Sequence, residues 1–196
     1  MIEGQPVEIE NGTRQNARAW FLYSESDPAD ATGCQSEQRM VYFGLQEAIN
    51  EVRRVINGFD GSRHSQNGAE PVALVGFSKG SVFVHILAAL ANACNLADHP
   101  ISPFCRIRCA VLASGFQAMH SETIVEGNVE VVGFDGLALP SMHLIGENDT
   151  SVVPKLTEKL ASCFVDAELL VHEKGHILPQ KSAQCAEILS FIEKHI

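Results

Sequence analysis

The chain has 196 residues, of which 45% are hydrophobic, so it can bury a core and is too apolar to be mostly disordered. It carries 14 basic and 24 acidic side chains, which gives a net charge of −10. A nucleic-acid backbone would be repelled by this charge, and the basic residues form no run beyond Arg53-Arg54. The composition therefore favours a single globular domain over residues 1–196 and argues against nucleic acid as a partner.

Neither a secretory signal nor a membrane span is predicted. The segment Met1–Pro6 lacks a basic start and an apolar run, and no apolar stretch approaches the roughly 20 residues that cross a bilayer. We therefore expect a cytoplasmic protein with reduced cysteines. Cys105 and Cys109 lie on an apolar run without a second ligand pair, so no zinc site is expected there. The six cysteines are Cys34, Cys94, Cys105, Cys109, Cys163 and Cys185.

The first 70 residues predict one helix and little other regular structure. Between Ser36 and Asn57 apolar residues recur every three or four positions, which is typical of an amphipathic helix, and Asn57-Gly58 can end it. A marginal strand is expected at 7–9 and a loop rich in Gly, Ser and Asn at 58–70.

From residue 71 onward, apolar runs that predict strands alternate with helices. This alternation, without an internal repeat or linker, is typical of an α/β protein whose mostly parallel sheet is covered by helices on both faces. Residues 117–140 show no sustained period and are expected to form a pocket wall or lid. The predicted strands are 71–75, 105–113, 129–132, 141–146 and 167–172, and the predicted helices run from the turn at 76–80 to about 95, from 154 to 163 and from 181 to 196.

The turn between the strand at 71–75 and the following helix carries a Gly-x-Ser-x-Gly motif, Gly76 to Gly80. In this context the motif predicts a nucleophile elbow, in which Ser78 is held in a strained backbone conformation at the positive end of a helix. We expect Gly76 and Gly80 to leave room for the strand and the helix to pack closely. The motif is common by chance, and the alternative is an ordinary turn capped by a serine.

Two residues that follow later strands can complete a hydrolytic site. Asp149 and His176 give the order serine, acid, histidine, which is the chain order of α/β-hydrolases. An imidazole can take the serine proton, and a buried carboxylate can fix the imidazole tautomer. Asp149 alone is as readily a turn residue, and Glu147 is its nearest competitor as the acid.

A rival motif overlaps this histidine. His172 to His176 satisfies His-Glu-x-x-His, the pattern of zinc peptidases, which works only on a helix because positions i and i+4 then share one face. Here His172 ends an apolar strand, Gly175 interrupts and Pro179 follows, so a helix is disfavoured. A zinc peptidase acting through His172 and His176 is the least favoured alternative, and no metal is expected.

Several short motifs together carry a resemblance to a known family. They are Arg18-Ala19-Trp20, Leu74 to Ser81, Ser114-Gly115-Phe116, Leu139 to Gly146, Asn148-Asp149 with Val153-Pro154, and Gly175 to Pro179. At these positions, from about residue 18 to the C-terminus, the chain resembles the FSH family of eukaryotic serine hydrolases. The resemblance implies an α/β-hydrolase-like three-layer sandwich, with Ser78 as nucleophile, Asp149 as acid and His176 as base. It also implies esterase or thioesterase chemistry on small-molecule acyl substrates, without a cofactor.

The resemblance fails at the N-terminus. Family members begin with a strand that ends in His-Gly, and the loop after it supplies one oxyanion amide; residues 1–17 contain nothing similar. The fold is therefore expected to be N-terminally incomplete, with the backbone N–H of Lys79 as the remaining oxyanion donor. A non-catalytic binding protein with the hydrolase fold is the main alternative. Because a missing strand would expose sheet edges, a homo-oligomer is also left open. Phe77, Phe116 and Ile177 are the expected substrate-binding residues.

Overall fold

The computed structural model describes residues 5–6, 18–19, 22–25, 40–58, 70–96, 102–118, 125–126, 129–130 and 133–196. The contacts of the chain divide it into two units. The first comprises Met1–Val55 and Met119–Thr123, and the second comprises Ile56–Ala118 and Ile124–Ile196. The expectation of a single domain over residues 1–196 stays a prediction.

The first unit contains two antiparallel strand pairs and the start of helix α1 (Leu45–Gly58). The pairs are β1 (Gln5–Pro6) with β2 (Arg18–Ala19) and β3 (Leu22–Glu25) with β4 (Met40–Phe43). The prediction of a helix from Ser36 is therefore wrong over β4. Its run of β-branched and aromatic residues favours a strand, and Gly44 with φ +78° separates it from the helix. The predicted strand at 7–9 and residues 59–69 of the loop predicted at 58–70 lie outside the described residues.

The amphipathic character of α1 is confirmed. Its buried apolar side chains recur at the spacing of one helix face, and the intervening positions are mostly exposed. These buried residues are Leu45, Ala48, Ile49, Val52 and Ile56.

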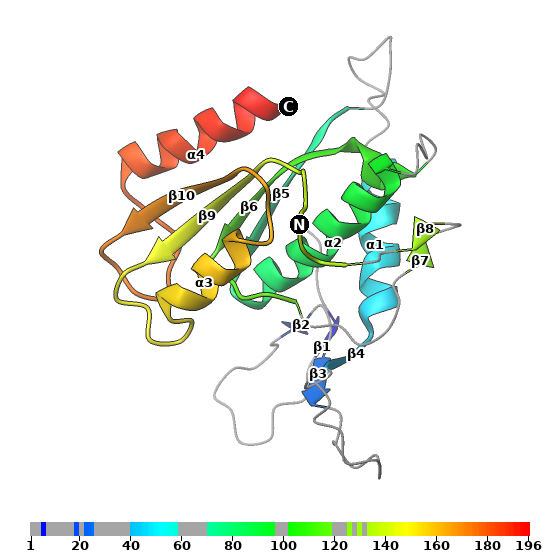
Figure 1. Ribbon diagram of the computed structural model, residues 1–196, viewed down its shortest axis with the longest axis horizontal. Helices are drawn as coiled ribbons and strands as arrows, with labels where there is room; N and C mark the ends of the chain where they lie inside the picture. Colours follow the sequence, from blue (N-terminus) through cyan, green and yellow to red (C-terminus); the bar gives the residue numbers. More distant parts are fainter. Residues whose placement is uncertain are drawn as a thin grey trace. The chain divides into compact units, whose positions relative to one another are not determined.

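The second unit is built on a parallel four-stranded sheet in the order β10-β9-β6-β5 (Figure 1). Its strands are β5 (Val72–Phe77), β6 (Ile107–Ala113), β9 (Ser141–Gly146) and β10 (Ala167–His172). β6 begins two residues later than predicted because a 3-10 turn, η1 (Pro103–Arg106), precedes it and starts with a proline. The first two residues of the strand predicted at 129–132 form β8 (Val129–Glu130), which pairs with β7 (Val125–Glu126) in a short hairpin, and residues 131–132 lie outside the described residues.

Helices cover both faces of this sheet, as the alternation of elements predicted. The helices α2 (Lys79–Leu96) and α3 (Pro154–Ala161) lie on one face, and α4 (Ser182–His195) lies on the other (Figure 1). On the α4 face an apolar cluster forms the core. It consists of Cys109, Val111, Ala113, Met142, Leu144, Leu170 and Phe191. Burial of these side chains supplies the main free energy that holds α4 on the sheet.

The cysteine prediction is confirmed for the residues that the structure describes. Among the described residues no disulfide is formed by Cys94, Cys105, Cys109, Cys163 or Cys185, and three of these side chains are buried. Cys34 lies outside the described residues. Within the described ranges, none of the helices combines the length and the apolar character needed to span a membrane.

Candidate active site

The nucleophile elbow predicted at Gly76–Gly80 has the expected backbone. Ser78 has φ +54°, in the left-handed region that a side chain disfavours. Its N–H donates to the carbonyl of Ala113 at 2.9 Å, and its carbonyl accepts from the N–H of Ser81 at 2.9 Å. These two bonds tie the strained residue to the end of β6 and to the first turn of α2.

The two glycines of the motif have different roles. A Cβ at Gly76 would lie 2.6 Å from the carbonyl oxygen of Gly80 and 2.8 Å from the Cα of Ser81, so no side chain fits there. A Cβ at Gly80 would meet no atom within 4 Å. The prediction that Gly80 makes room for close packing is therefore wrong. Instead, the backbone of Gly80 occupies the space in which a side chain of Gly76 would lie.

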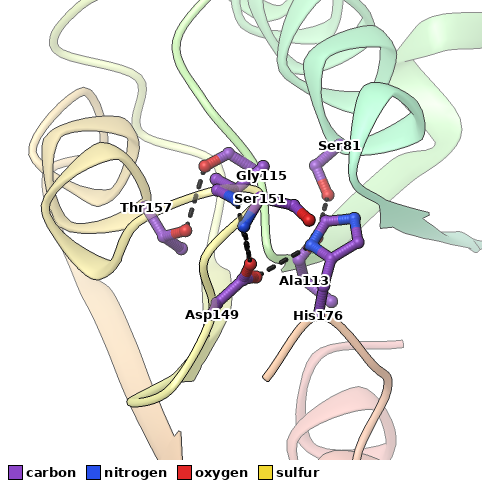
Figure 2. A network of polar contacts seen from close by, with 8 residues as sticks. Ser81, Ala113, Gly115, Asp149, Ser151, Thr157 and His176 are labelled. Atoms are coloured by element: carbon purple, nitrogen blue, oxygen red, sulfur yellow. Dashed lines mark hydrogen bonds and ion pairs between the residues drawn. The ribbon is translucent and has the colours of Figure 1, made fainter.

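The turn that carries Asp149, Gly146–Val152 (the acid turn), follows β9 at the same end of the sheet. One carboxylate oxygen of Asp149 accepts the N–H groups of Ser151 and Val152, each at 2.9 Å. The other lies 2.8 Å from Nδ1 of His176 (Figure 2). The Asp149 side chain is 1% exposed and that of His176 is 26% exposed. Glu147, the competing acid, is exposed, so the geometry favours Asp149.

The electrostatics of this turn keep Asp149 ionised. Burial raises the pKa of its carboxyl, but hydrogen bonds from the Val152 N–H, from His176 and from the Ser151 N–H outweigh burial and hold the pKa below its ordinary value. The nearby Ser114 hydroxyl also lowers the pKa of Asp149. Its geometry does not meet the criteria for a hydrogen bond to any described group. A carboxylate can only accept, so the proton of His176 is placed on Nδ1 and Nε2 is left as an acceptor.

The loop that carries His176 is packed against the acid turn. A Cβ at Gly146 would lie 2.5 Å from the carbonyl oxygen of Gly175 and 2.7 Å from that of Lys174. The backbone N–H of Asn148 donates to Lys174 O at 3.2 Å, and its side-chain amide donates to Glu173 O at 2.6 Å. The glycines and the amide thus fix the distance between the two loops.

The imidazole of His176 lies beside the elbow. Its ring centroid is 4.7 Å from that of Phe77, the residue before Ser78, with 41° between the ring planes. Among the described contacts, no hydrogen bond joins the Ser78 hydroxyl to His176. The structure therefore brings Asp149 and His176 into contact and places the imidazole next to the elbow.

The expected substrate-binding residues lie in different environments. Phe77 packs on the apolar cluster of the α4 face as well as on His176, so part of its ring is core. Phe116 is partly buried just beyond Gly115. Ile177 is 38% exposed beside His176. Lys79 begins α2, and burial lowers the pKa of its amino group.

The zinc-peptidase pattern does not form its required helix. His172 is the last residue of β10, and His176 lies in the loop between β10 and α4. Within the part of the chain that the structure describes, no group of three His, Cys, Asp or Glu side chains could hold a metal ion. The helical interpretation of this motif is therefore wrong, because the residues before it continue the parallel sheet.

Two supporting residues were missed by sequence reasoning. The hydroxyl of Thr157 donates to Gly115 O at 3.0 Å, and that of Ser81 donates to Ala113 O at 2.9 Å (Figure 2). Both side chains are buried, and together they fix the backbone that leaves β6. Their only sequence signal is a hydroxyl on the buried face of a helix.

A cavity of about 240 Å³ lies away from these residues. It is located between the end of α2 and the starts of β6 and β9. Its lining includes Asn92, Arg108 and Pro140, and it contains no residue of the elbow or the acid turn. We therefore assign it no part in the chemistry of the site.

A parallel sheet with a strand–elbow–helix unit and an acid and a histidine after later strands defines an α/β-hydrolase fold. The chain belongs to the FSH1 serine hydrolase family, whose profile matches residues 3–188. It is 31% identical over 178 residues to Esterase OVCA2 of Mus musculus, covering 89% of this chain and 66% of that protein. The Homo sapiens protein of the same name gives the same identity and coverage. The chain thus spans just under two thirds of the length of these relatives.

A solved structure supports the fold assignment. Acyl-protein thioesterase 2 of Zea mays matches with a TM-score of 0.54 over 90% of this chain and 71% of that chain, at 12% sequence identity. At this identity the likeness concerns the fold alone.

Proposed function

We propose that the chain is a serine hydrolase that cleaves carboxylic ester or thioester bonds through an acyl-Ser78 intermediate. The observation that carries the proposal is the 2.8 Å contact of Asp149 with His176 beside a serine held at φ +54°. The name of the relatives, esterase, supports the same reaction class.

In the proposed first half-reaction, Nε2 of His176 removes the proton of the Ser78 hydroxyl as its oxygen attacks the acyl carbonyl carbon. Asp149 stabilises the imidazolium that forms, and the backbone N–H of Lys79 donates to the oxyanion. The imidazolium then protonates the leaving alcohol or thiol, which departs with the electron pair of the broken bond. Water, deprotonated by the same imidazole, releases the acid and restores the Ser78 hydroxyl.

The hydrogen bond between Ser78 and His176 has to form during this cycle. Catalytic hydrogen bonds are often long without substrate and tighten when substrate binds, so its absence here is compatible with the proposal. Phe116 and Ile177 are the residues proposed to contact the acyl group, since both lie within two residues of a site element and are not fully buried.

A fluorophosphonate probe tests the proposal directly. We expect stoichiometric labelling, located on Ser78 by peptide mass spectrometry, and loss of both labelling and p-nitrophenyl ester turnover in Ser78→Ala. Circular dichroism of the variant controls for folding. Folded wild-type protein that neither labels nor turns over esters would contradict the proposal.

The second candidate is a non-catalytic binding protein with the hydrolase fold. The missing hydrogen bond between Ser78 and His176 is the observation that favours it. Ester turnover that depends on Ser78 would exclude it, whereas binding of an acyl ester without turnover would favour it over the hydrolase.

A further inference from the structure

A buried histidine of α2 binds the backbone at both ends of the segment that joins β6 to the region before β9. His85 has 0% exposure. Its Nδ1 accepts the N–H of Ala118 at 3.1 Å, and its Nε2 lies 2.9 Å from the carbonyl oxygen of Phe134. One imidazole thus holds together two positions that are separated by 16 residues in the sequence.

The neighbours of His85 fix its protonation state. An amide N–H can only donate and a carbonyl can only accept, so Nδ1 is unprotonated and Nε2 carries the proton. Burial lowers the pKa of His85 to about 4, against the opposing effect of the bond to Phe134, so the ring is neutral near pH 7. The rings of Phe134 and Phe164 flank it, with centroids 5.6 and 5.7 Å away. A single orientation of the imidazole satisfies both backbone groups.

The bond to Ala118 also places Phe116. The Gly115 carbonyl is held by the Thr157 hydroxyl at 3.0 Å, and the Ala118 N–H is held by His85. Gly115 itself is packed so closely that a Cβ there would lie 2.5 Å from Cβ of Ser81. Phe116 therefore lies on a short stretch of backbone with fixed points on both sides.

Further hydrogen bonds hold residues 135–138, which lead into β9. The side-chain amide of Gln117 donates to Asp135 at 3.3 Å, and Asn92 of α2 accepts the N–H of Ala138 at 3.1 Å. The helix that follows Ser78 in sequence thus supplies two polar side chains that bind the backbone between β6 and β9. The same helix orients the nucleophile and this backbone.

We propose that His85 is a positioning residue that fixes the backbone of residues 116–118 and thereby sets which acyl groups the site accepts. This inference rests on the proposed function, because it assigns Phe116 to the acyl-binding wall. His85 touches neither Ser78 nor His176 by any described hydrogen bond, so it acts through the backbone that it holds.

Three substitutions separate the two bonds of His85. Asn places its carbonyl oxygen near the position of Nδ1 and can accept from Ala118, whereas Gln places its amide nitrogen near Nε2 and can donate to Phe134. Phe keeps the aromatic packing and removes both bonds. Comparison of His85→Asn, His85→Gln and His85→Phe therefore shows which bond matters.

The readout is the ratio of kcat/KM for p-nitrophenyl octanoate to that for p-nitrophenyl acetate. We expect His85→Phe and His85→Gln to lower this ratio by about fivefold, mainly through a higher KM for octanoate, since the net contribution of one hydrogen bond is about 1 kcal/mol, which corresponds to about a factor of five. His85→Asn should keep the wild-type ratio. An unchanged ratio in all three variants, or an equal fall in His85→Asn and His85→Phe, would overturn the proposal.

Hydrogen exchange separates this inference from the proposed function. The Ala118 amide should lose protection in His85→Gln and His85→Phe and keep it in His85→Asn, whether or not the protein is an esterase. If the fluorophosphonate probe fails to label wild-type protein, the proposed function fails and the role in acyl selection fails with it. If labelling succeeds but Ala118 protection is the same in all variants, only the role of His85 is refuted. Should His85→Phe not fold, the pair His85→Asn and His85→Gln still decides the result.

Discussion

The elbow at Gly76–Gly80 and the acid turn at Gly146–Val152 lie at the same end of the sheet, and both combine close backbone packing with hydrogen bonds, but they place their central residue in different ways. At the elbow, steric packing fixes the conformation of Ser78: its backbone is strained at φ +54°, and backbone atoms occupy the space of a Gly76 side chain. At the acid turn, hydrogen bonds fix the position of the Asp149 carboxylate, which accepts from three donors. A side chain added at Gly76 would force the backbone to shift, whereas a set of hydrogen bonds weakens step by step as its members are removed.

The largest expected effect breaks the acid turn and leaves the elbow intact. Asp149→Asn offers His176 an amide that can donate, which favours the wrong imidazole tautomer, so kcat should fall by about 10³- to 10⁴-fold. Stopped-flow or steady-state kinetics of ester hydrolysis measure this loss. Glu147→Gln is the matched control, since Glu147 is exposed on the same turn, and it should retain turnover. A comparable loss in both variants would argue against Asp149 as the acid.

The next largest effect is expected from substitutions at the two glycines of the elbow. Gly76→Ala puts a methyl group against the Gly80 backbone and should destabilise the fold by about 1–3 kcal/mol. Gly80→Ala meets open space and should change the stability by less than about 1 kcal/mol, since Ala is also the better helix residue. Urea unfolding of both variants measures the difference. Equal stabilities would show that the close approach at Gly76 is not needed.

The smallest expected effect is on the pH dependence of the unfolding free energy. The folded-state pKa of Asp149 lies below its ordinary value of 3.8, so its ionised form stabilises the fold above about pH 4, and this contribution is lost as pH falls through the lower folded-state pKa. Wild-type protein should therefore lose more unfolding free energy between pH 5 and pH 3 than Asp149→Asn. His85 and His143, whose pKa values burial lowers to about 4 and about 3, titrate in both proteins and cancel in the difference. Parallel stability curves would contradict this assignment.

The sequence predicted the elements that depend on strong local patterns. The strands at 141–146 and 167–172 agree with β9 and β10 residue for residue, because each is an apolar run bounded by turn residues. The strand β4 was missed because its apolar residues also fit the spacing of the helix that follows. For short apolar runs, periodicity alone does not separate strand from helix.

Within the site, the sequence could order the candidates but not choose among all of them. Asp149 and Glu147 lie on one turn, and only the fold shows that one carboxylate is buried against His176 while the other faces solvent. The role of His85 was beyond prediction, because a histidine on an apolar helix carries no sign of which distant backbone groups it will meet. Roles that depend on tertiary contacts leave no local pattern.

The contact of Gly146 with Gly175 has a mechanical consequence. Because no side chain fits between the two backbones and Asn148 binds the second loop, the carboxylate and the imidazole belong to one stiff assembly. A displacement of either loop is then expected to carry the other loop with it. The hydrogen bond between Asp149 and His176 would therefore be kept through such a motion.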